Sequence, residues 1–319
     1  MEKAEGGNQT PATEFILLGF GNQPGLQILL FLLFLVIYVV TMAGNLLIAA
    51  LVVADQHLHT PMYFFLGNLS CLETCYTSTI LPRLLAGVLT GDRTISVEGC
   101  ITQLAVFGFL ATTECCLLAV MSYDRYLAIC KPLHYGTLMN GQLCLQLEAG
   151  SWINGFLSCT ILVCLMSESI FCDPNEMDHF FCELTSMLKL SCSDTSQITP
   201  IIYTFSFLNL VLPFLLTLTS YVCVISIILR IPSTSGRQKA FSTCSSHIIL
   251  VTIFYGTIMI VYMVPKSSTL RALNKVFSVC YTVLMPPANP LIYSLRNREV
   301  KEALINAIGG SVTLTKNSD

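Results

Sequence analysis

Long apolar stretches, separated by short polar connections, recur along the whole chain. A helix needs about 20 largely apolar residues to cross the hydrocarbon core of a bilayer. Seven stretches meet this requirement, and we expect membrane-spanning helices at Leu26–Ala54, Pro61–Leu89, Glu98–Cys130, Leu143–Met166, Thr199–Leu229, Lys239–Val264 and Ala272–Leu295. The pattern predicts an all-α membrane protein with a seven-transmembrane helix bundle.

Outside these stretches lie two terminal segments and one long connection. Residues 1–25 form a polar N-terminal tail ahead of the bundle, which occupies residues 26–296. At the start of residues 297–319, charged positions alternate with apolar ones. This predicts a short amphipathic helix on the membrane surface, followed by a cytoplasmic tail. The connection Ser167–Ile198 is polar, acidic and rich in cysteine.

Composition supports a lipid environment. Of the 319 residues, 54% are hydrophobic and 11% are charged, whereas soluble domains carry about 25% charged residues. The net charge of −3 gives no reason to expect a nucleic-acid partner. The first apolar stretch is too long, and lies too far into the chain, for a cleaved signal peptide. We therefore expect it to be retained as a span.

Two features predict an extracellular N-terminus and a cytoplasmic C-terminus in the plasma membrane. Asn8 begins an N-glycosylation sequon in the polar tail. Four of the fifteen cysteines fall in or beside the outer loops of this arrangement, namely Cys100, Cys172, Cys182 and Cys192. Four cysteines in an oxidising compartment allow three pairings. Basic residues add little, because nine lie inside and seven outside in this orientation.

Long motifs lie at the ends of several spans. Met121–Cys130 closes the third span with an Asp-Arg pair, which is costly at a membrane edge unless it has a role. The other motifs are Gly44-Asn45 in the first span, His57–Tyr63 before the second, Lys239–His247 opening the sixth and Pro286–Asn297 closing the seventh. Together they resemble the olfactory receptor family of rhodopsin-like G-protein-coupled receptors, in its tetrapod-type class. The resemblance runs from about Phe15 to Ile308. The family often has Met-Leu where this chain has Pro287-Ala288, and the extra proline predicts a local kink in the seventh span.

The resemblance implies two disulfides, Cys100–Cys182 and Cys172–Cys192, which would hold the long loop over the bundle. It also implies a ligand cavity between the third, fifth and sixth spans. The residues that helical spacing places on this side are Phe107, Gly108, Ala111, Thr112, Phe205, Ser206, Asn209, Tyr255, Ile258, Met259 and Tyr262. This set is mostly apolar with a few polar groups, as small-molecule sites are. Plain helix packing explains any single member equally well.

The third span indicates the charge of the ligand. No acidic residue lies between Cys100 and Glu114, and Phe107 matches the position where amine receptors of the wider superfamily place an Asp. A buried ammonium group without a counter-ion is costly. We therefore expect a small, neutral, largely apolar ligand.

Two glutamates, Glu73 and Glu114, fall in the middle of the second and third spans. Two carboxylates in a low-dielectric interior cannot both remain charged and unpaired. Either one takes up a proton, or a cation lies between them. The resemblance favours Na⁺, held together with Asn45 and Asn289, and no other cofactor is expected.

The resemblance also assigns a switch at the cytoplasmic end of the bundle. Its residues would be Asp124, Arg125, Tyr126, Tyr221 and Tyr293. In the resting state Asp124 would pair with Arg125. An agonist would free Arg125 to contact a heterotrimeric G protein of the stimulatory, olfactory type, which raises cAMP.

Two alternatives stay open. A rhodopsin-like receptor for a non-odorant ligand in another tissue fits the same sequence, because a cavity does not record where a gene is expressed. A small transporter or channel fits less well, because the chain shows no internal repeat. The sequence contains no metal-ligand cluster, phosphate-binding loop or nucleophile motif that would indicate an enzyme.

Overall fold

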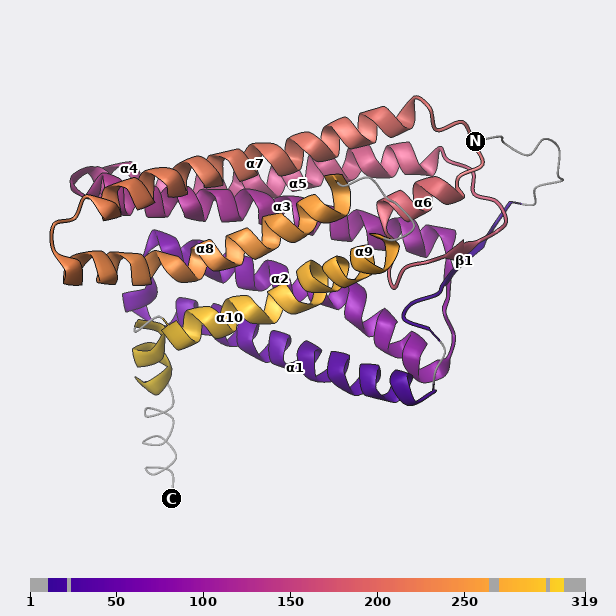
Figure 1. Cartoon of the computed structure of the whole chain (residues 1–319), viewed down its shortest axis with the longest axis horizontal. Coiled ribbons are helices and arrows are strands. Elements are labelled where there is room, and N and C mark those ends of the chain that lie inside the picture. The colour runs from indigo at the N-terminus through magenta and orange to yellow at the C-terminus, as the bar shows by residue number, and fades with distance from the viewer. Residues whose placement is uncertain (1–10, 22–23, 264–269, 297–298, 307–319) are drawn as a thin grey trace, which may run out of the picture.

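Seven long helical segments lie side by side in the computed structural model, which describes residues 11–21, 24–263, 270–296 and 299–306 (Figure 1). They are α1 (Pro24–Ala54), α2 (Pro61–Thr90), α3 (Val97–Cys130), α5 (Gly141–Ser167), α7 (Ile198–Leu229), α8 (Thr234–Met263) and a segment that combines α9 (Leu270–Val279) with α10 (Met285–Arg296). The predicted seven-helix fold is confirmed. The largest shift in a boundary is in α8, which begins at Thr234 instead of Lys239.

Local sequence signals explain where several helices begin and end. Ser96 caps α3, because its hydroxyl accepts a hydrogen bond from the Gly99 backbone N–H at 3.1 Å. Asn140 caps α5 in the same way through the Leu143 N–H at 2.9 Å. α2 ends at Thr90 and is capped by Gly91, whose φ of 75° lies in the left-handed region that glycine adopts without strain.

The outer faces of the helices are apolar. Large side chains such as Ile28 on α1 and Leu212 on α7 are exposed, as lipid-facing residues are. By length and composition alone, four of the described helices are apolar enough to cross a membrane, namely α1, α3, α5 and α7. Polar residues around Glu73 lower the mean hydropathy of α2, and the apolar part of α8 is limited to His247–Tyr262.

The helix α3 lies at the centre of the bundle and packs against α2, α5 and α7. Its close approach to α5 depends on Gly155. A Cβ atom at this position would lie 2.2 Å from Thr113 Oγ1 and 2.8 Å from the Phe109 carbonyl oxygen. Small residues allow such close packing between membrane helices. This contact therefore fixes α5 against α3.

A small sheet covers one end of the bundle. Its central strand, β1 (Glu14–Leu17), pairs antiparallel with β2 (Thr94–Ser96) and parallel with β3 (Glu176–Met177). This sheet differs from the sequence-based expectation of an N-terminal tail over residues 1–25. Strands of two to four residues are too short to show the alternation that identifies a strand.

The same end of the bundle carries both disulfides and is called the disulfide end below. Cys100–Cys182 ties the long loop to α3, and Cys172–Cys192 closes a turn within the loop. The loop also contains the short helix α6 (Leu184–Leu190). The opposite end, which carries Asp124 and Arg125, is called the Asp-Arg end, and it includes the one-turn helix α4 (Tyr135–Leu138).

Two features complete the C-terminal part of the fold. A π-helical turn, η3 (Cys280–Leu284), joins α9 to α10. Residues 299–306 are helical, and Val300 and Ala303 are buried while Lys301 and Glu302 are exposed. This alternation agrees with the predicted amphipathic helix.

Candidate functional site

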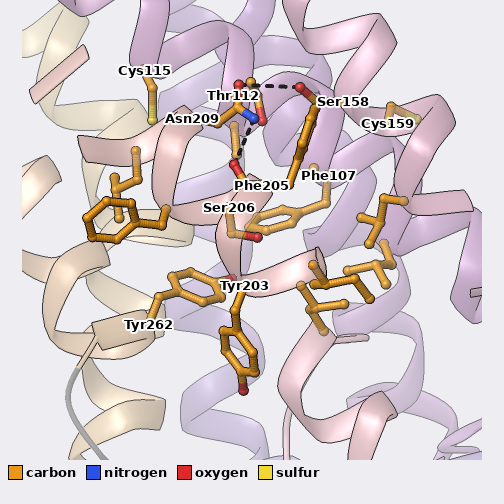
Figure 2. A pocket seen from close by; sticks show the side chains of 18 of the residues that line it. Phe107, Thr112, Cys115, Ser158, Cys159, Tyr203, Phe205, Ser206, Asn209 and Tyr262 are labelled. Carbon is orange, nitrogen blue, oxygen red and sulfur yellow. Dashed lines mark hydrogen bonds between the residues drawn. The ribbon is translucent and has the colours of Figure 1, made fainter. Parts of the chain in front are cut away.

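A cavity of about 500 Å³ lies between α3, α5, α7 and α8, next to the loop helix α6 (Figure 2). Nine of the eleven predicted ligand residues line it, namely Phe107, Gly108, Ala111, Thr112, Phe205, Ser206, Asn209, Ile258 and Tyr262. The structure therefore brings together residues that lie more than 150 positions apart in the sequence.

The two other predicted residues, Tyr255 and Met259, do not line the cavity. Tyr255 is fully buried, its hydroxyl donates to the Cys115 carbonyl oxygen at 2.8 Å, and its ring packs against Phe214. Cys115 and Ile258 line the cavity near it, but the side chain of Tyr255 is packed between α3 and α7 and does not reach the lining. Met259 follows Ile258, and one residue turns a helix by about 100°, which directs Met259 away from the cavity face.

The polar groups of the cavity gather around Asn209. Its Oδ1 accepts hydrogen bonds from Asn154 Nδ2 at 2.9 Å and from the Ser158 hydroxyl at 3.4 Å, and its Nδ2 donates to the Phe205 carbonyl at 2.9 Å. Figure 2 shows Thr112 beside this group, with Ser206 farther along the cavity. Among the described residues, the hydroxyl groups of Thr112 and Ser206 have no hydrogen-bond partner, so a ligand could bind to them.

The rest of the lining is apolar or aromatic, and none of the lining residues among those described is charged. Phe107 contacts the rings of Tyr76, Phe181 and Tyr281 at centroid distances of 5.2, 5.0 and 6.2 Å. An aromatic cluster therefore occupies the position at which a cationic ligand would need a carboxylate.

A second cluster of polar side chains, called the Glu73 cluster below, is buried between α1, α2, α3 and α10. Asn289 Nδ2 donates a hydrogen bond to Glu73 Oε1. Asn45 Nδ2 donates to the Pro286 carbonyl at 3.2 Å. That carbonyl lacks its helical partner, because Pro290, four residues later, has no N–H.

Three oxygen atoms of this group are buried and accept no hydrogen bond among the described residues: Glu73 Oε2, Asn45 Oδ1 and Asn289 Oδ1. Glu114 lies close enough for its charge to act on Glu73. The described residues contain no group of three or more His, Cys, Asp or Glu side chains suited to a metal ion. Two carboxylates with two amide oxygens nevertheless fit a hard monovalent cation, because such ions bind oxygen.

At the Asp-Arg end, Asp124 is held from two sides. Arg125 donates to its Oδ2 from Nη2 at 2.5 Å and from Nε at 3.1 Å, and the Tyr135 hydroxyl donates to its Oδ1 at 2.7 Å. Burial, followed by this hydrogen bond, raises the pKa of Tyr135, so the hydroxyl keeps its proton. The predicted pairing of Asp124 with Arg125 is therefore present and gains a third member, Tyr135.

The other predicted switch residues are only partly brought together. Tyr126 packs against a cluster that contains Tyr221, and the Tyr221 hydroxyl shares a hydrogen bond with Nδ1 of His247. His247, which closes the Lys239–His247 motif in α8, is therefore an addition to the residues predicted for the switch. The side chain of Tyr293, like the whole of Asn8, lies outside the described residues.

A profile of the family described as "Olfactory receptor" matches residues 34–310, which is most of the chain. The chain belongs to the olfactory receptor family. Olfactory receptor 5AP2 of Mus musculus is 48% identical over 93% of this chain and 94% of its own length. Olfactory receptor 11A1 of Homo sapiens is 48% identical over 95% and 96% of the two chains, and olfactory receptor 10A7 of Homo sapiens is 47% identical over 94% and 95%.

Membership confirms the resemblance drawn from the motifs. Olfactory receptors are multi-pass G-protein-coupled receptors of the plasma membrane and not enzymes. In general terms, the family implies an odorant ligand and a G-protein partner. The apolar outer faces of the helices agree with this membrane location.

One wall of this olfactory receptor's cavity was not among the predicted ligand residues. The side chains of α5 that line it include Ser158, Leu162 and Leu165. Their spacing of four and three residues places them on one helical face, so the signal was present in the sequence. It was passed over because the cavity was assigned to the third, fifth and sixth spans alone. Thr185 of the loop and Tyr281 of the seventh span were missed for the same reason.

Proposed function

We propose that this olfactory receptor binds a small, neutral, largely apolar odorant in the cavity between α3, α5, α7 and α8. Binding then activates a heterotrimeric G protein of the stimulatory, olfactory type, which raises cAMP. The observation that carries the proposal is the uncharged lining of the cavity. Its volume of about 500 Å³ suits a small molecule, because ligand sites usually measure about 300–1,000 Å³.

The polar groups define which functional group the odorant would carry. Thr112 and Ser206 each offer a hydroxyl, and Asn209 Nδ2 has a second N–H beyond the one that it donates to Phe205. These three donors favour a ligand with a hydrogen-bond acceptor, such as an ester, ketone, aldehyde or alcohol. The remaining apolar wall would bury its hydrocarbon part.

The Asp-Arg end supports a resting state. Asp124 is fully buried and is neutralised by Arg125, with Tyr135 adding a further hydrogen bond. In our proposal an agonist favours a second packing of α8 against α3 and α7, in which Arg125 is released toward the G protein. This is a shift between two populations, biased by contacts that differ between them.

The proposed orientation places the disulfide end outside the cell and the Asp-Arg end in the cytoplasm. Disulfides such as Cys100–Cys182 and Cys172–Cys192 persist in oxidising compartments and are rare in the cytosol. Asn8 would then be available for glycosylation. The C-terminal segment, which follows α10 at the Asp-Arg end, would lie in the cytoplasm (Figure 1).

We also propose that Na⁺ binds in the Glu73 cluster. Glu73, Glu114, Asn45 and Asn289 would hold it, because three of their oxygen atoms are buried without a donor. The ion would offset one of the two negative charges that the ionised carboxylates carry. The alternative is a protonated, hydrogen-bonded pair of glutamates.

A cAMP reporter assay with a broad odorant panel tests the ligand and the coupling together. Neutral esters, ketones and alcohols should activate the receptor. Ser206→Ala should weaken the strongest agonist by about 2- to 13-fold, because one hydrogen bond contributes about 0.5–1.5 kcal/mol. Thr219→Ala is the matched control on α7, because Thr219 is exposed and does not line the cavity. Arg125→Ala should abolish the response while surface expression persists. Alkylamines as the strongest agonists, with neutral compounds inactive, would contradict the proposed ligand class.

A further inference from the structure

The cavity has an apolar rim on the outside of the bundle, between α5 and α7. Three side chains that line the cavity are also exposed: Ile161 by 37%, Tyr203 by 44% and Phe207 by 51%. Ile161 belongs to α5, and the two others belong to α7. The next residues along these helices, such as Leu157 and Leu208, are exposed apolar side chains that do not line the cavity. The rim therefore lies within the surface that faces lipid.

On the other sides of the cavity, no described lining side chain is exposed. Toward the disulfide end, Leu184 and Thr185 of α6 are buried, and the Cys100–Cys182 disulfide fixes the loop that carries them. On the inner side, Phe107 of α3 and Ile258 of α8 are buried as well. α5 and α7 each pack along α3 but touch each other over a much smaller part of their length. The gap between these two helices is the side on which the cavity approaches the surface.

We propose that this gap is a lateral portal through which the odorant enters the cavity from the bilayer. The inference rests on the proposed function in one respect, because its occupant is the neutral, apolar ligand proposed above. Such molecules concentrate in hydrocarbon, so the local concentration at the rim exceeds that in water. Ile161, Leu162, Phe207 and the ring of Tyr203 provide an apolar passage. A charged molecule would have to lose its hydration to follow the same route. The portal therefore selects for neutral ligands before they reach the polar group around Asn209.

Bromobenzene is a suitable probe, because it is neutral, partitions into membranes and quenches tryptophan on contact. The receptor is reconstituted into lipid vesicles with the reporter Phe107→Trp, on the inner wall of the cavity. Subtracting the signal of the parent protein removes the contribution of Trp152, the single tryptophan of the chain. The measured quantity is the rate at which bromobenzene, delivered in lipid, quenches Trp at position 107. The readout needs no signalling, so it remains decisive if no odorant raises cAMP.

Two pairs of variants in the reporter background test the route in opposite directions. Ile161→Phe narrows the rim and should slow quenching at least threefold, whereas Leu157→Phe, one turn away on the same lipid-facing side, should leave the rate unchanged. Phe207→Ala widens the rim and should accelerate quenching at least twofold, whereas Leu208→Ala should not. A loss of folding cannot produce both signs. The portal is refuted if Trp at position 107 is not quenched, or if the rim variants quench at the same rate as their controls.

Discussion

Replacing Gly155 with alanine should separate α5 from α3 and destabilise the receptor. The added Cβ would lie 2.2 Å from Thr113 Oγ1 and 2.8 Å from the Phe109 carbonyl oxygen, whereas ordinary contacts begin at 3.4 Å. The Thr113 hydroxyl can rotate, although it then loses its 2.9 Å hydrogen bond to the Phe109 carbonyl. The carbonyl itself belongs to a helix backbone and cannot move alone. Overpacking in a core costs about 1–3 kcal/mol, and the backbone contact places this variant in the upper half of that range.

Thermal unfolding of the purified receptor in lipid nanodiscs measures the effect. Gly150→Ala is the matched control, because Gly150 also lies on α5 and a Cβ there would meet no atom within 4 Å. Adding Thr113→Ala to Gly155→Ala should restore part of the lost stability, because it removes the nearer of the two clashes. Agonist potency should fall as well, because Ser158 and Leu162 line the cavity from the same helix. Equal unfolding temperatures for the two alanine variants would refute the reasoning.

Two further predictions concern the Glu73 cluster and the contact between Tyr135 and Asp124. NaCl, compared with choline chloride at equal ionic strength, should stabilise the wild type by about 1.4 kcal/mol at ten times the dissociation constant. A Glu73→Gln/Glu114→Gln variant should not respond to Na⁺, and identical titration curves for the two proteins would count against a bound ion. Tyr135→Phe removes the hydroxyl that donates to Asp124 at 2.7 Å, a contact worth about 1.5–3 kcal/mol when the acceptor is charged. Basal cAMP should therefore rise severalfold at matched surface expression, and an unchanged basal level would show that Tyr135 does not stabilise the resting state.

The helices could be predicted from the sequence because a membrane span depends mainly on the length of an apolar run. α3 and α7 begin and end within one residue of the expected bounds. α8 departs from this, because its first turns from Thr234 are polar and helical, and an apolar run does not report a helix that continues past the membrane. The strands at the disulfide end depend on pairing between segments about 80 and 160 residues apart, because Ile16 pairs with both Thr94 and Glu176. No local pattern contains that information.

The cavity could be predicted only as far as helical faces could be identified. Spacing correctly grouped Phe205, Ser206 and Asn209 on α7, because the face of a helix follows from its period. The rotation of each helix relative to its neighbours was harder to obtain. Tyr255 packs against Phe214 and bonds to the Cys115 carbonyl, although its spacing from Tyr262 is helical, and Met259 lies one position outside the lining face. Both errors arise because spacing groups residues on a helix but does not say how that helix is turned toward its neighbours.

The prolines of the seventh span determine part of the surroundings of the Glu73 cluster. Pro286, Pro287 and Pro290 have no N–H, so the carbonyl groups four residues before each of them lose their helical donors. Immediately before Pro286 and Pro287, the helix widens into the π-helical turn η3. In this turn the Met285 N–H donates to the Cys280 carbonyl, five residues earlier. The additional proline, Pro287, is thus accommodated by a wider turn, and the helix continues through α10. The third freed carbonyl, that of Pro286, accepts its hydrogen bond from Asn45. Gly44 lies so close to Pro290 that a Cβ atom at its position would be only 3.1 Å from the proline ring. Because glycine has no Cβ atom, α1 can approach α10 closely enough for Asn45 to make that bond. The prolines of α10 therefore determine where Asn45 lies, and with it one side of the group that surrounds Glu73.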